Sequence, residues 1–367
     1  MKRRITALAL GAAMVLSLAA CGGGEKPAAT EAAGSSGAVT EAATEAAGSE
    51  AASADTGGVE APSSPERYSV GGGSAGGNFY VVGGGIATVV NNLLPDYFVM
   101  TAEETGGGTA NLTMIQNGDV EFGVTMTSSI DEALKGEAEW TGGKPLDKIR
   151  GMLPLYPSYL TIYSLKSSNL NTLQDLNGKI VGFGSKGAAM DSVYREAFPA
   201  MGVNPKDIFN DGHSATATAV SDGQVDAALL YSLPPFAAIT ELEATKELTF
   251  IGLTKEEQDY LTSTYSFMKA GNMPAGSYQG VTEDLPVVIE WNVLCTSSDV
   301  PEDYVYLITK TLMENNPPLV EVYKGLTNVT PENTLNFNCP LHAGVVRYLK
   351  EAGIEVPAEL IPAEYQG

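Results

Sequence analysis

The arrangement of strand-like and helical segments beyond residue 66 constrains the fold more than any other feature of this chain. Strand-like runs end in glycine-rich connections, and segments with helical periodicity follow them directly. The strand-like runs are 67–70, 97–102 and 120–126, and the helical segments between them are 76–94 and 109–117. Strands that alternate with helices through short connections indicate a parallel sheet flanked by helices.

The same order of elements recurs later in the chain. A strand-like run at 179–183 leads through a glycine loop into a helical segment at 188–201, and a second helical segment ends at Asp222-Gly223 before a strand at 225–231. The C-terminal part adds a strand at 287–295 and helices at 302–315 and 342–352. Two α/β lobes of similar plan are the prediction that this repetition favours.

The connections between the repeated units predict how the lobes are joined. Candidate crossings lie at 139–160 and 270–276, so that lobe I comprises 67–157 and 270–367 and lobe II comprises 158–269. A chain that crosses twice forms a hinge. Open α/β sheets bind ligands beyond the carboxyl ends of their strands, which predicts a ligand cleft between the lobes.

The first 66 residues have a different composition and predict export. Residues 1–20 have the basic start, apolar run and small-residue end of a signal peptide, and the run is too short for a transmembrane helix. Leu18-Ala19-Ala20-Cys21 resembles the bacterial lipobox, so Cys21 is the expected lipidation site. Residues 21–66 are rich in Ala, Glu, Gly and Ser and predict a disordered linker. The expected location is the outer face of the cytoplasmic membrane, with a lipid anchor.

Charge and residue counts exclude several classes of function. The 367 residues include 21 Lys and Arg against 44 Asp and Glu, a formal charge of −23, which disfavours nucleic acid and anionic headgroups as partners. Three cysteines and two histidines give no recognisable metal site, and no Gly-x-Ser-x-Gly motif is present. We therefore expect no metal, no cofactor and no catalytic residues.

The histidines and the two downstream cysteines have structural interpretations. His213 follows Asp211-Gly212 and is expected to be a loop or cap residue, and His342 is expected to be a structural or cap residue at the start of a helix. Cys295 and Cys339 could pair in an oxidising compartment, but sequence alone cannot show whether their Cα atoms approach closely enough.

Glycine loops are the strongest candidates for binding chemistry. Segments 71–76 and 182–187 match the dinucleotide pattern G-x-G-x-x-G, and Glu103 stands near the end of a second strand as a ribose-binding acid would. A secreted NAD-binding enzyme therefore stays open as an alternative. Glycine loops before helices also suit a small anion, because the helix start presents free N–H groups and a positive dipole end. Loops 74–79, 105–109 and 184–190 together predict a carboxylate site.

Several phrases in order along residues 67–367 resemble one family of receptors. The phrases are GGSAGGNFYVVGGGIA at 72–87, TGGGTANL and NGDVEFG within 104–123, the segment 179–188, SDGQVDA around 222–227, PAGSYQG at 274–280, PEDYVYLITK at 301–310 and PLHAGVVRYLKEAG at 340–353. In this order they resemble the TAXI class of solute-binding proteins, which serve tripartite ATP-independent periplasmic (TRAP) transporters. The resemblance implies a two-lobed, type II periplasmic-binding-protein-like fold that closes on its ligand.

The resemblance also implies the residues of the pocket. They are Gly76, Gly77, Asn78, Phe79, Thr105, Gly106, Gly107, Met126 and Thr127 in lobe I, and Ser185, Lys186, Gly187 and Ala188 in lobe II. Phe79 stands where the family usually has tyrosine, Lys186 replaces a small residue and Ala188 replaces a threonine. Lys186 is the only basic residue in the three loops, so we expect it to contact a carboxylate.

The function expected from this resemblance is binding without catalysis. The receptor would hold a small carboxylate or amino acid, such as glutamate, glutamine or a 2-oxo-dicarboxylate, and pass it to the membrane subunits of a TRAP transporter. An amino-acid receptor of an ATP-driven importer is the main alternative, and a sensor, an adhesin or a secreted enzyme comes behind it. The ligand, the permease and the oligomeric state are not determined by the sequence.

Overall fold

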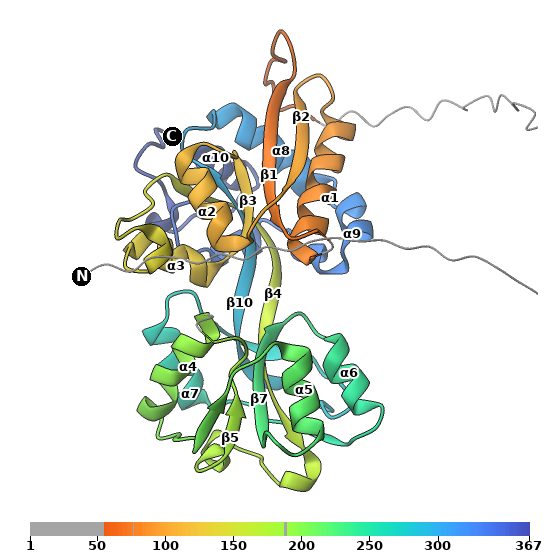
Figure 1. Ribbon diagram of the computed structural model, residues 1–367. Helices are drawn as coiled ribbons and strands as arrows, with labels where there is room; N and C mark the ends of the chain where they lie inside the picture. The colour runs from red at the N-terminus through yellow and green to blue at the C-terminus, as the bar shows by residue number, and fades with distance from the viewer. Residues whose placement is uncertain (1–54, 76, 187–188) are drawn as a thin grey trace, which may run out of the picture. The chain divides into compact units, whose positions relative to one another are not determined.

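The computed structural model describes residues 55–367 apart from 76, 187 and 188, and the described residues fall in one compact unit (Figure 1). The predicted signal peptide, Cys21 and the linker up to residue 54 lie outside the described residues. Within the described part, no helix is both long enough and apolar enough to cross a membrane.

A mixed ten-stranded sheet organises the unit. Its hydrogen-bonded order is β2-β1-β3-β10-β4-β7-β5-β6, with β8 paired to β4 and β9 to β10. The strands β1, β2 and β3 pair in parallel, as do β5, β6 and β7, whereas β10 is antiparallel to β3 and β4. The strands are β1 Glu66–Gly73, β2 Phe98–Glu104, β3 Phe122–Met126, β4 Ile149–Leu165, β5 Ile180–Gly182, β6 Asp207–Phe209, β7 Ala227–Ser232, β8 Leu248–Phe250, β9 Lys269–Met273 and β10 Leu285–Ser297.

Helices follow the strands, and the structure adds α3, α6, α7 and α9 to those that the sequence predicts. The helices are α1 Asn78–Leu93, α2 Gly108–Asn117, α3 Thr127–Lys135, α4 Ala189–Ala200, α5 His213–Ser221, α6 Ala237–Glu243, α7 Lys255–Thr264, α8 Glu302–Glu314, α9 Pro317–Val322 and α10 Ala343–Glu351. The predicted helices at 76–94, 109–117, 188–201, 302–315 and 342–352 are confirmed within a residue or two at each end. The α2 helix stops at Gly118, which adopts the left-handed conformation (φ 79°) that glycine accepts at low cost.

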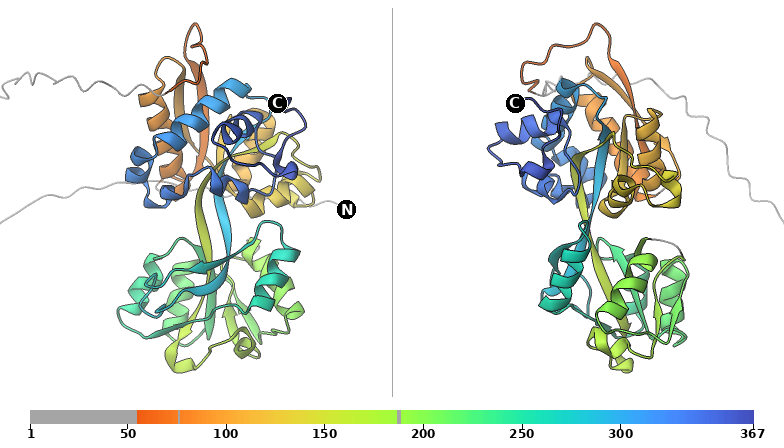
Figure 2. Two further views of the ribbon diagram at one scale, coloured as in Figure 1. Left: turned by 180° about the vertical axis from the view of Figure 1, so that it is seen from behind. Right: turned by 90° about the vertical axis from the view of Figure 1, so that its left-hand side faces the viewer.

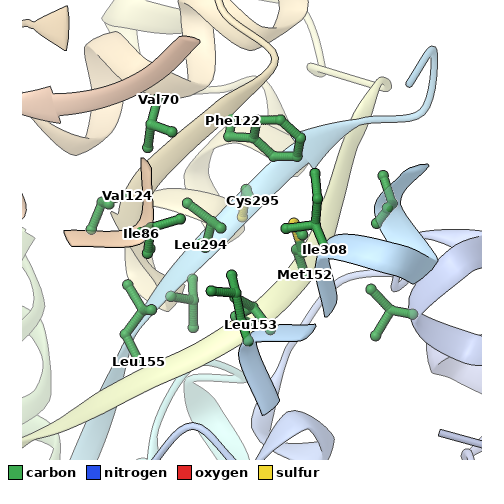
Figure 3. Close-up of a cluster of buried hydrophobic side chains, with 14 of the residues drawn as sticks. Val70, Ile86, Phe122, Val124, Met152, Leu153, Leu155, Leu294, Cys295 and Ile308 are labelled. Atoms are coloured by element: carbon green, nitrogen blue, oxygen red, sulfur yellow. The ribbon is translucent and has the colours of Figure 1, made fainter. Parts of the chain in front are cut away.

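Buried side chains divide the unit into two lobes. One large cluster draws on residues 59–156 and 291–360, and we call this part lobe I; some of its members are shown in Figure 3. Two further clusters draw on residues 160–288, which we call lobe II. The strands β4 and β10 run side by side from one lobe to the other (Figures 1 and 2), and their register pairs 149–159 with 289–297.

The predicted return of the chain at 270–276 is wrong. The β9 strand pairs with the first half of β10 as an antiparallel hairpin, and Met273, Tyr278 and Val281 are buried in the core of lobe II. The chain therefore completes this hairpin in lobe II before it returns, and β10 itself is the second crossing. The first predicted crossing, 139–160, overlaps β4.

The predicted linker also extends too far toward the folded part. Val59 is buried in the core of lobe I, and its carbonyl accepts a hydrogen bond from the Tyr97 hydroxyl (2.8 Å). Asp55 forms an ion pair with the buried Lys310 of α8 (3.2 Å). Residues from Asp55 onward therefore belong to lobe I, although their composition resembles that of the linker before them.

His342 has the capping role that the sequence predicts. Its Nδ1 accepts a hydrogen bond from the Gly344 amide at the start of α10 (3.2 Å), and its Nε2 lies 3.0 Å from the Val300 carbonyl. Nε2 must therefore carry the proton, and burial lowers the pKa of the ring to about 4. Cys295 and Cys339, whose pairing the sequence left open, are both free and buried.

Candidate functional site

The carboxyl end of β3 in lobe I lies on the crossing strands. Met126, the last residue of β3, pairs with Asn292 of β10, which in turn pairs with Tyr156 of β4. The Asn292 side chain strengthens the pairing of β10 with β4, because its amide donates to the Tyr156 carbonyl (3.1 Å) and the Ser158 hydroxyl (2.8 Å).

The carboxyl end of β7 in lobe II reaches the same stretch of β4. Ser232, the last residue of β7, pairs with Tyr159, so that only Pro157 and Ser158 separate the two points along β4. A strand rises about 3.3 Å per residue, which places these points about 10 Å apart. The strand ends of both lobes therefore converge on the crossing, as the predicted site between the lobes requires.

Two helices of lobe I begin close together without side-chain caps. The N-cap residues are Gly77 for α1 and Gly107 for α2, and neither helix has an acidic residue in its first turn. A Cβ atom placed on Gly73 would lie 3.8 Å from the Gly107 Cα, so the two loops are in contact. The Thr105 amide also donates to the Gly73 carbonyl (3.2 Å). Uncapped helix starts present free N–H groups and the positive end of the helix dipole to an anion.

The fully buried Asn111 side chain fixes these loops to the sheet. Its amide nitrogen lies 3.0 Å from the Gly71 carbonyl, 2.9 Å from that of Gly72 and 2.7 Å from that of Val124. Its oxygen accepts a hydrogen bond from the Thr105 hydroxyl (2.6 Å). A single side chain thus holds the ends of β1 and β3 and the loop before α2.

A buried hydroxyl lies directly beneath the start of α2. Thr125 is fully buried, and its Oγ1 has no hydrogen-bond partner among the residues that the structure describes. A Cβ atom placed on Gly108 would lie 2.9 Å from this oxygen. The absence of a side chain at Gly108 therefore lets the first turn of α2 sit against Thr125.

The start of α3 contributes to the joint between the lobes. Thr127 is buried, and its hydroxyl lies 3.2 Å from the Phe267 carbonyl of lobe II and accepts a hydrogen bond from the Trp291 amide (3.3 Å). Met126 is only half-buried. The predicted ligand contacts of both residues stay predictions, and the observed contacts of Thr127 are with the hinge.

Lobe I also contacts lobe II through a short 3₁₀ helix, η4 Lys324–Asn328. A Cβ atom placed on Gly325 would lie 2.9 Å from the Leu233 Cδ2 of lobe II and 3.0 Å from the Tyr156 Cβ. The Tyr156 and Tyr323 rings lie 4.9 Å apart between their centroids. The hinge strand β4 therefore packs against η4 as well.

A network of polar side chains holds the glycine loop of lobe II in place. Gly184 has a positive φ of 75°, and its carbonyl accepts a hydrogen bond from the Asn210 amide (2.9 Å). The same amide lies 2.9 Å from the buried Asp191 carboxylate, which also pairs with Arg195 (2.7 Å). Arg195 is therefore neutralised by Asp191, and Lys186 is left as the charged side chain of the loop itself.

The two predicted ligand-binding residues of this loop that the structure describes are exposed to solvent. Ser185 and Lys186 both face solvent, and no ion pair of Lys186 is found within the described residues. Gly187 and Ala188 lie outside the described residues, as does Gly76 in lobe I. In lobe I, Gly77 and Thr105–Gly107 lie in the two loops that contact each other, and Asn78 and Phe79 are the first two residues of α1.

His213 lies beside the glycine loop of lobe II as the first residue of α5. A Cβ atom placed on Gly184 would lie 3.2 Å from the His213 Cε1, and the ring meets Phe236 edge-on with 5.9 Å between centroids. Burial lowers the pKa of the imidazole, so the neutral ring predominates at pH 7. His213 is the first helical residue after the N-cap Gly212, not the loop or cap residue that the sequence predicted, and its ring lies beside the glycine loop of lobe II.

Sequence reasoning missed Asn111, Thr125 and Glu290. Glu290 is a buried carboxyl on β10 that accepts a hydrogen bond from the Ser128 amide at the start of α3 (2.8 Å). Asn111 and Glu290 each carry a recognisable signal, because they are polar residues at positions where the element is otherwise apolar. In the described part of the chain, no group of three or more His, Cys, Asp or Glu residues could hold a metal ion.

Solved structures of binding proteins match this chain at low sequence identity. A TctC solute-binding protein from Polaromonas is 15% identical over 73% of this chain and 90% of its own, with a TM-score of 0.50. The periplasmic aliphatic sulphonate-binding protein SsuA from Escherichia coli is 15% identical over 79% of this chain and 91% of its own, with a TM-score of 0.42. Substrate-binding domain 2 of GlnP from Lactococcus lactis is 11% identical over 72% of this chain and 97% of its own, with a TM-score of 0.41.

The TctC structure, with its TM-score of 0.50, confirms the fold class predicted from the sequence. The chain is a two-lobed α/β protein of the type II periplasmic-binding-protein kind, with a mixed sheet continuous through the crossing. The model of the NMT1-like family matches residues 70–353, which include the crossing strands, the glycine loops and α10. The chain belongs to the NMT1-like family and has the fold of the extracytoplasmic solute-binding proteins.

Proposed function

We propose that this protein is a lipid-anchored receptor that binds a small carboxylate or amino acid between its lobes and delivers it to a membrane transporter. The ligands best suited to the site are glutamate, glutamine and 2-oxo-dicarboxylates. The receptor performs no reaction on them. Its membrane partners are the permease subunits of a TRAP transporter, as the TAXI-like phrases of the sequence suggest.

The observation that carries this proposal is the pair of uncapped helix starts in lobe I. The first turns of α1 and α2 lie at adjoining loops, contain no acidic residue and have no side-chain cap. A ligand carboxylate placed there would supply the missing acceptor for N–H groups of both helices. The formal charge of −23 makes such a local positive region necessary if an anion is to bind.

The second lobe supplies the other half of the contacts. Lys186 lies on the loop before α4, and the strand ends of the two lobes converge on the same stretch of β4. Binding favours a closed arrangement because only that arrangement lets both lobes touch one small molecule. The shift toward it equals the difference in affinity between the open and closed forms.

The substitution Asn78→Asp tests the role of the helix starts with opposite effects on stability and on binding. Asn78 is the exposed first residue of α1, so a carboxylate there should stabilise the helix by about 0.3–1 kcal/mol. The same charge should repel a ligand carboxylate and weaken binding of L-glutamate several-fold in calorimetric titration.

The matched control is Asn92→Asp, which adds the same charge at the exposed C-terminal end of the same helix. It should lower stability slightly and leave the affinity within twofold of wild type. Equal losses of affinity in the two variants would mean that only net charge matters, and the helix starts would then have no part in binding.

A further inference from the structure

Glu290 occupies the point where β10 passes between the lobes. The residue is 4% exposed, and its Oε1 accepts a hydrogen bond from the Ser128 amide in the first turn of α3 (2.8 Å). Its neighbour Trp291 donates its own amide proton to the Thr127 hydroxyl (3.3 Å). The Glu290 carboxylate thus fixes the start of α3, and with it Met126 and Thr127 of the candidate site, onto the hinge strand.

The charged groups nearest to Glu290 do not neutralise it. On α3 the nearest is Glu132, whose charge disfavours ionisation of Glu290. From lobe II, Tyr194 and Tyr231 face it with a hydroxyl–hydroxyl distance of 3.0 Å between them. Burial raises the pKa of both tyrosines, and the charge of Glu290 adds to that rise.

The cations on neighbouring elements point elsewhere. Lys269 of β9 pairs with Ile289, and paired residues project from the same face, so Lys269 lies on the opposite face from Glu290. On α7, Lys255 forms an exposed ion pair with Asp259, and the side chain turned toward β10 is Gln258, which donates to the Val287 carbonyl (2.8 Å).

Of the other described cations on the neighbouring helices, Arg195 of α4 pairs with Asp191. Asp131 and Lys135 of α3 pair with each other, and Asp131 also accepts a hydrogen bond from Ser266. The β4 residue opposite Glu290 is Ser158, and α2 and β3 contain no charged residue.

Burial without a counter-charge raises the pKa of Glu290 to about 7, against the opposing effect of the two hydrogen bonds from Ser128. The ordinary value is 4.5. The folded chain therefore binds this proton more tightly than the unfolded chain does. The resulting stabilisation is complete below about pH 4.5 and is lost as the pH rises through about 7.

We propose that Glu290 is a proton-sensitive positioning residue of the hinge. The ionised carboxylate accepts the Ser128 amide strongly and clamps the start of α3 onto β10, whereas the protonated carboxyl is a weaker acceptor and loosens this joint. The protonation state of Glu290 then determines how firmly Met126 and Thr127 are held. For an anionic ligand, protonation also removes a buried negative charge beside the site, so affinity should rise as the pH falls.

Fluorescence of Trp291 tests this proposal without any ligand, so its failure is distinct from a failure of the proposed function. The full chain contains two tryptophans, and Trp140→Phe leaves Trp291, next to Glu290, as the reporter. We expect a single transition in its emission with a midpoint near pH 7. The transition should be abolished by Glu290→Gln. The control Glu257→Gln removes another buried glutamate, at the start of α7, and should leave the fluorescence transition unchanged.

Urea unfolding supplies a second readout. Between about pH 5 and about pH 8, the wild-type midpoint should fall relative to that of Glu290→Gln. A flat fluorescence titration, or a transition that persists in Glu290→Gln, overturns the proposal. If Glu290→Gln does not fold, NMR titration of ¹³C-labelled glutamate carboxyls in the wild-type chain decides. A carboxyl that titrates near pH 7 supports the proposal, and the absence of any that titrates above about pH 6 overturns it.

Discussion

Replacement of Asn111 by leucine is expected to destabilise the protein by roughly 3 kcal/mol or more, because three buried backbone carbonyls lose their shared donor. Leaving a buried polar group unpaired costs about 1–3 kcal/mol each, and the Thr105 hydroxyl loses its acceptor at the same time. Leucine has a similar volume, so loss of packing contributes little. Urea denaturation followed by circular dichroism measures the change.

The control for this prediction lies on the same helix. Asn117 is the exposed last residue of α2, and Asn117→Leu should change stability by no more than about 0.5 kcal/mol. Because Asn111 holds both glycine loops of lobe I, Asn111→Leu should also weaken ligand binding in whatever fraction stays folded. A loss of stability below about 1 kcal/mol would show that the Asn111 hydrogen bonds do not organise these loops.

Replacement of Lys186 by alanine is expected to weaken binding of a carboxylate ligand more than tenfold. A hydrogen bond to a charged group contributes about 1.5–3 kcal/mol, and each 1.4 kcal/mol corresponds to a factor of about ten in affinity. Lys186 is exposed in the described arrangement, so it loses no buried contact on substitution, and the stability of the unliganded protein should not change. Calorimetric titration with L-glutamate or 2-oxoglutarate gives the affinity.

Lys206→Ala is the matched control for Lys186→Ala. Lys206 is also exposed and also in lobe II, but it lies just before β6, at the amino end of that strand and away from the loop that carries Lys186. Loss of this charge should leave the affinity within twofold of wild type. An unchanged affinity in Lys186→Ala would remove Lys186 from the site, and equal losses in both variants would indicate a general effect of net charge.

Local periodicity and glycine connections were enough to predict the first three strands and two helices of lobe I, and β5, α4, α5 and β7 of lobe II, but not α3, α6, α7 or α9. The starts of α1, α2 and α5 follow directly from glycines that precede helical segments. The second crossing could not be predicted in the same way. The β9–β10 hairpin joins two strands within lobe II, and the long β10 then continues into lobe I with no glycine or turn-forming sequence at the crossing.

The candidate site could be predicted only in part, for a physical reason. Glycine loops are visible in sequence because they need a special residue type, and these loops do lie together in lobe I. The groups that hold them act through long-range contacts. Asn111 reaches Gly71 from 40 residues away, and Glu290 reaches Ser128 from 162 residues away. Neither partnership leaves a pattern within a single element.

Small-angle scattering with and without ligand tests the central claim, closure of two lobes on a small carboxylate, most directly. The chain from Ala51 onward should be used, because Asp55 and Val59 pack on lobe I, and it should be unfolded and refolded to remove any bound molecule. We predict that at least one of glutamate, glutamine and 2-oxoglutarate raises the Tm and reduces the radius of gyration. A raised Tm with an unchanged radius of gyration, or no rise in Tm with any of the three, would contradict the account.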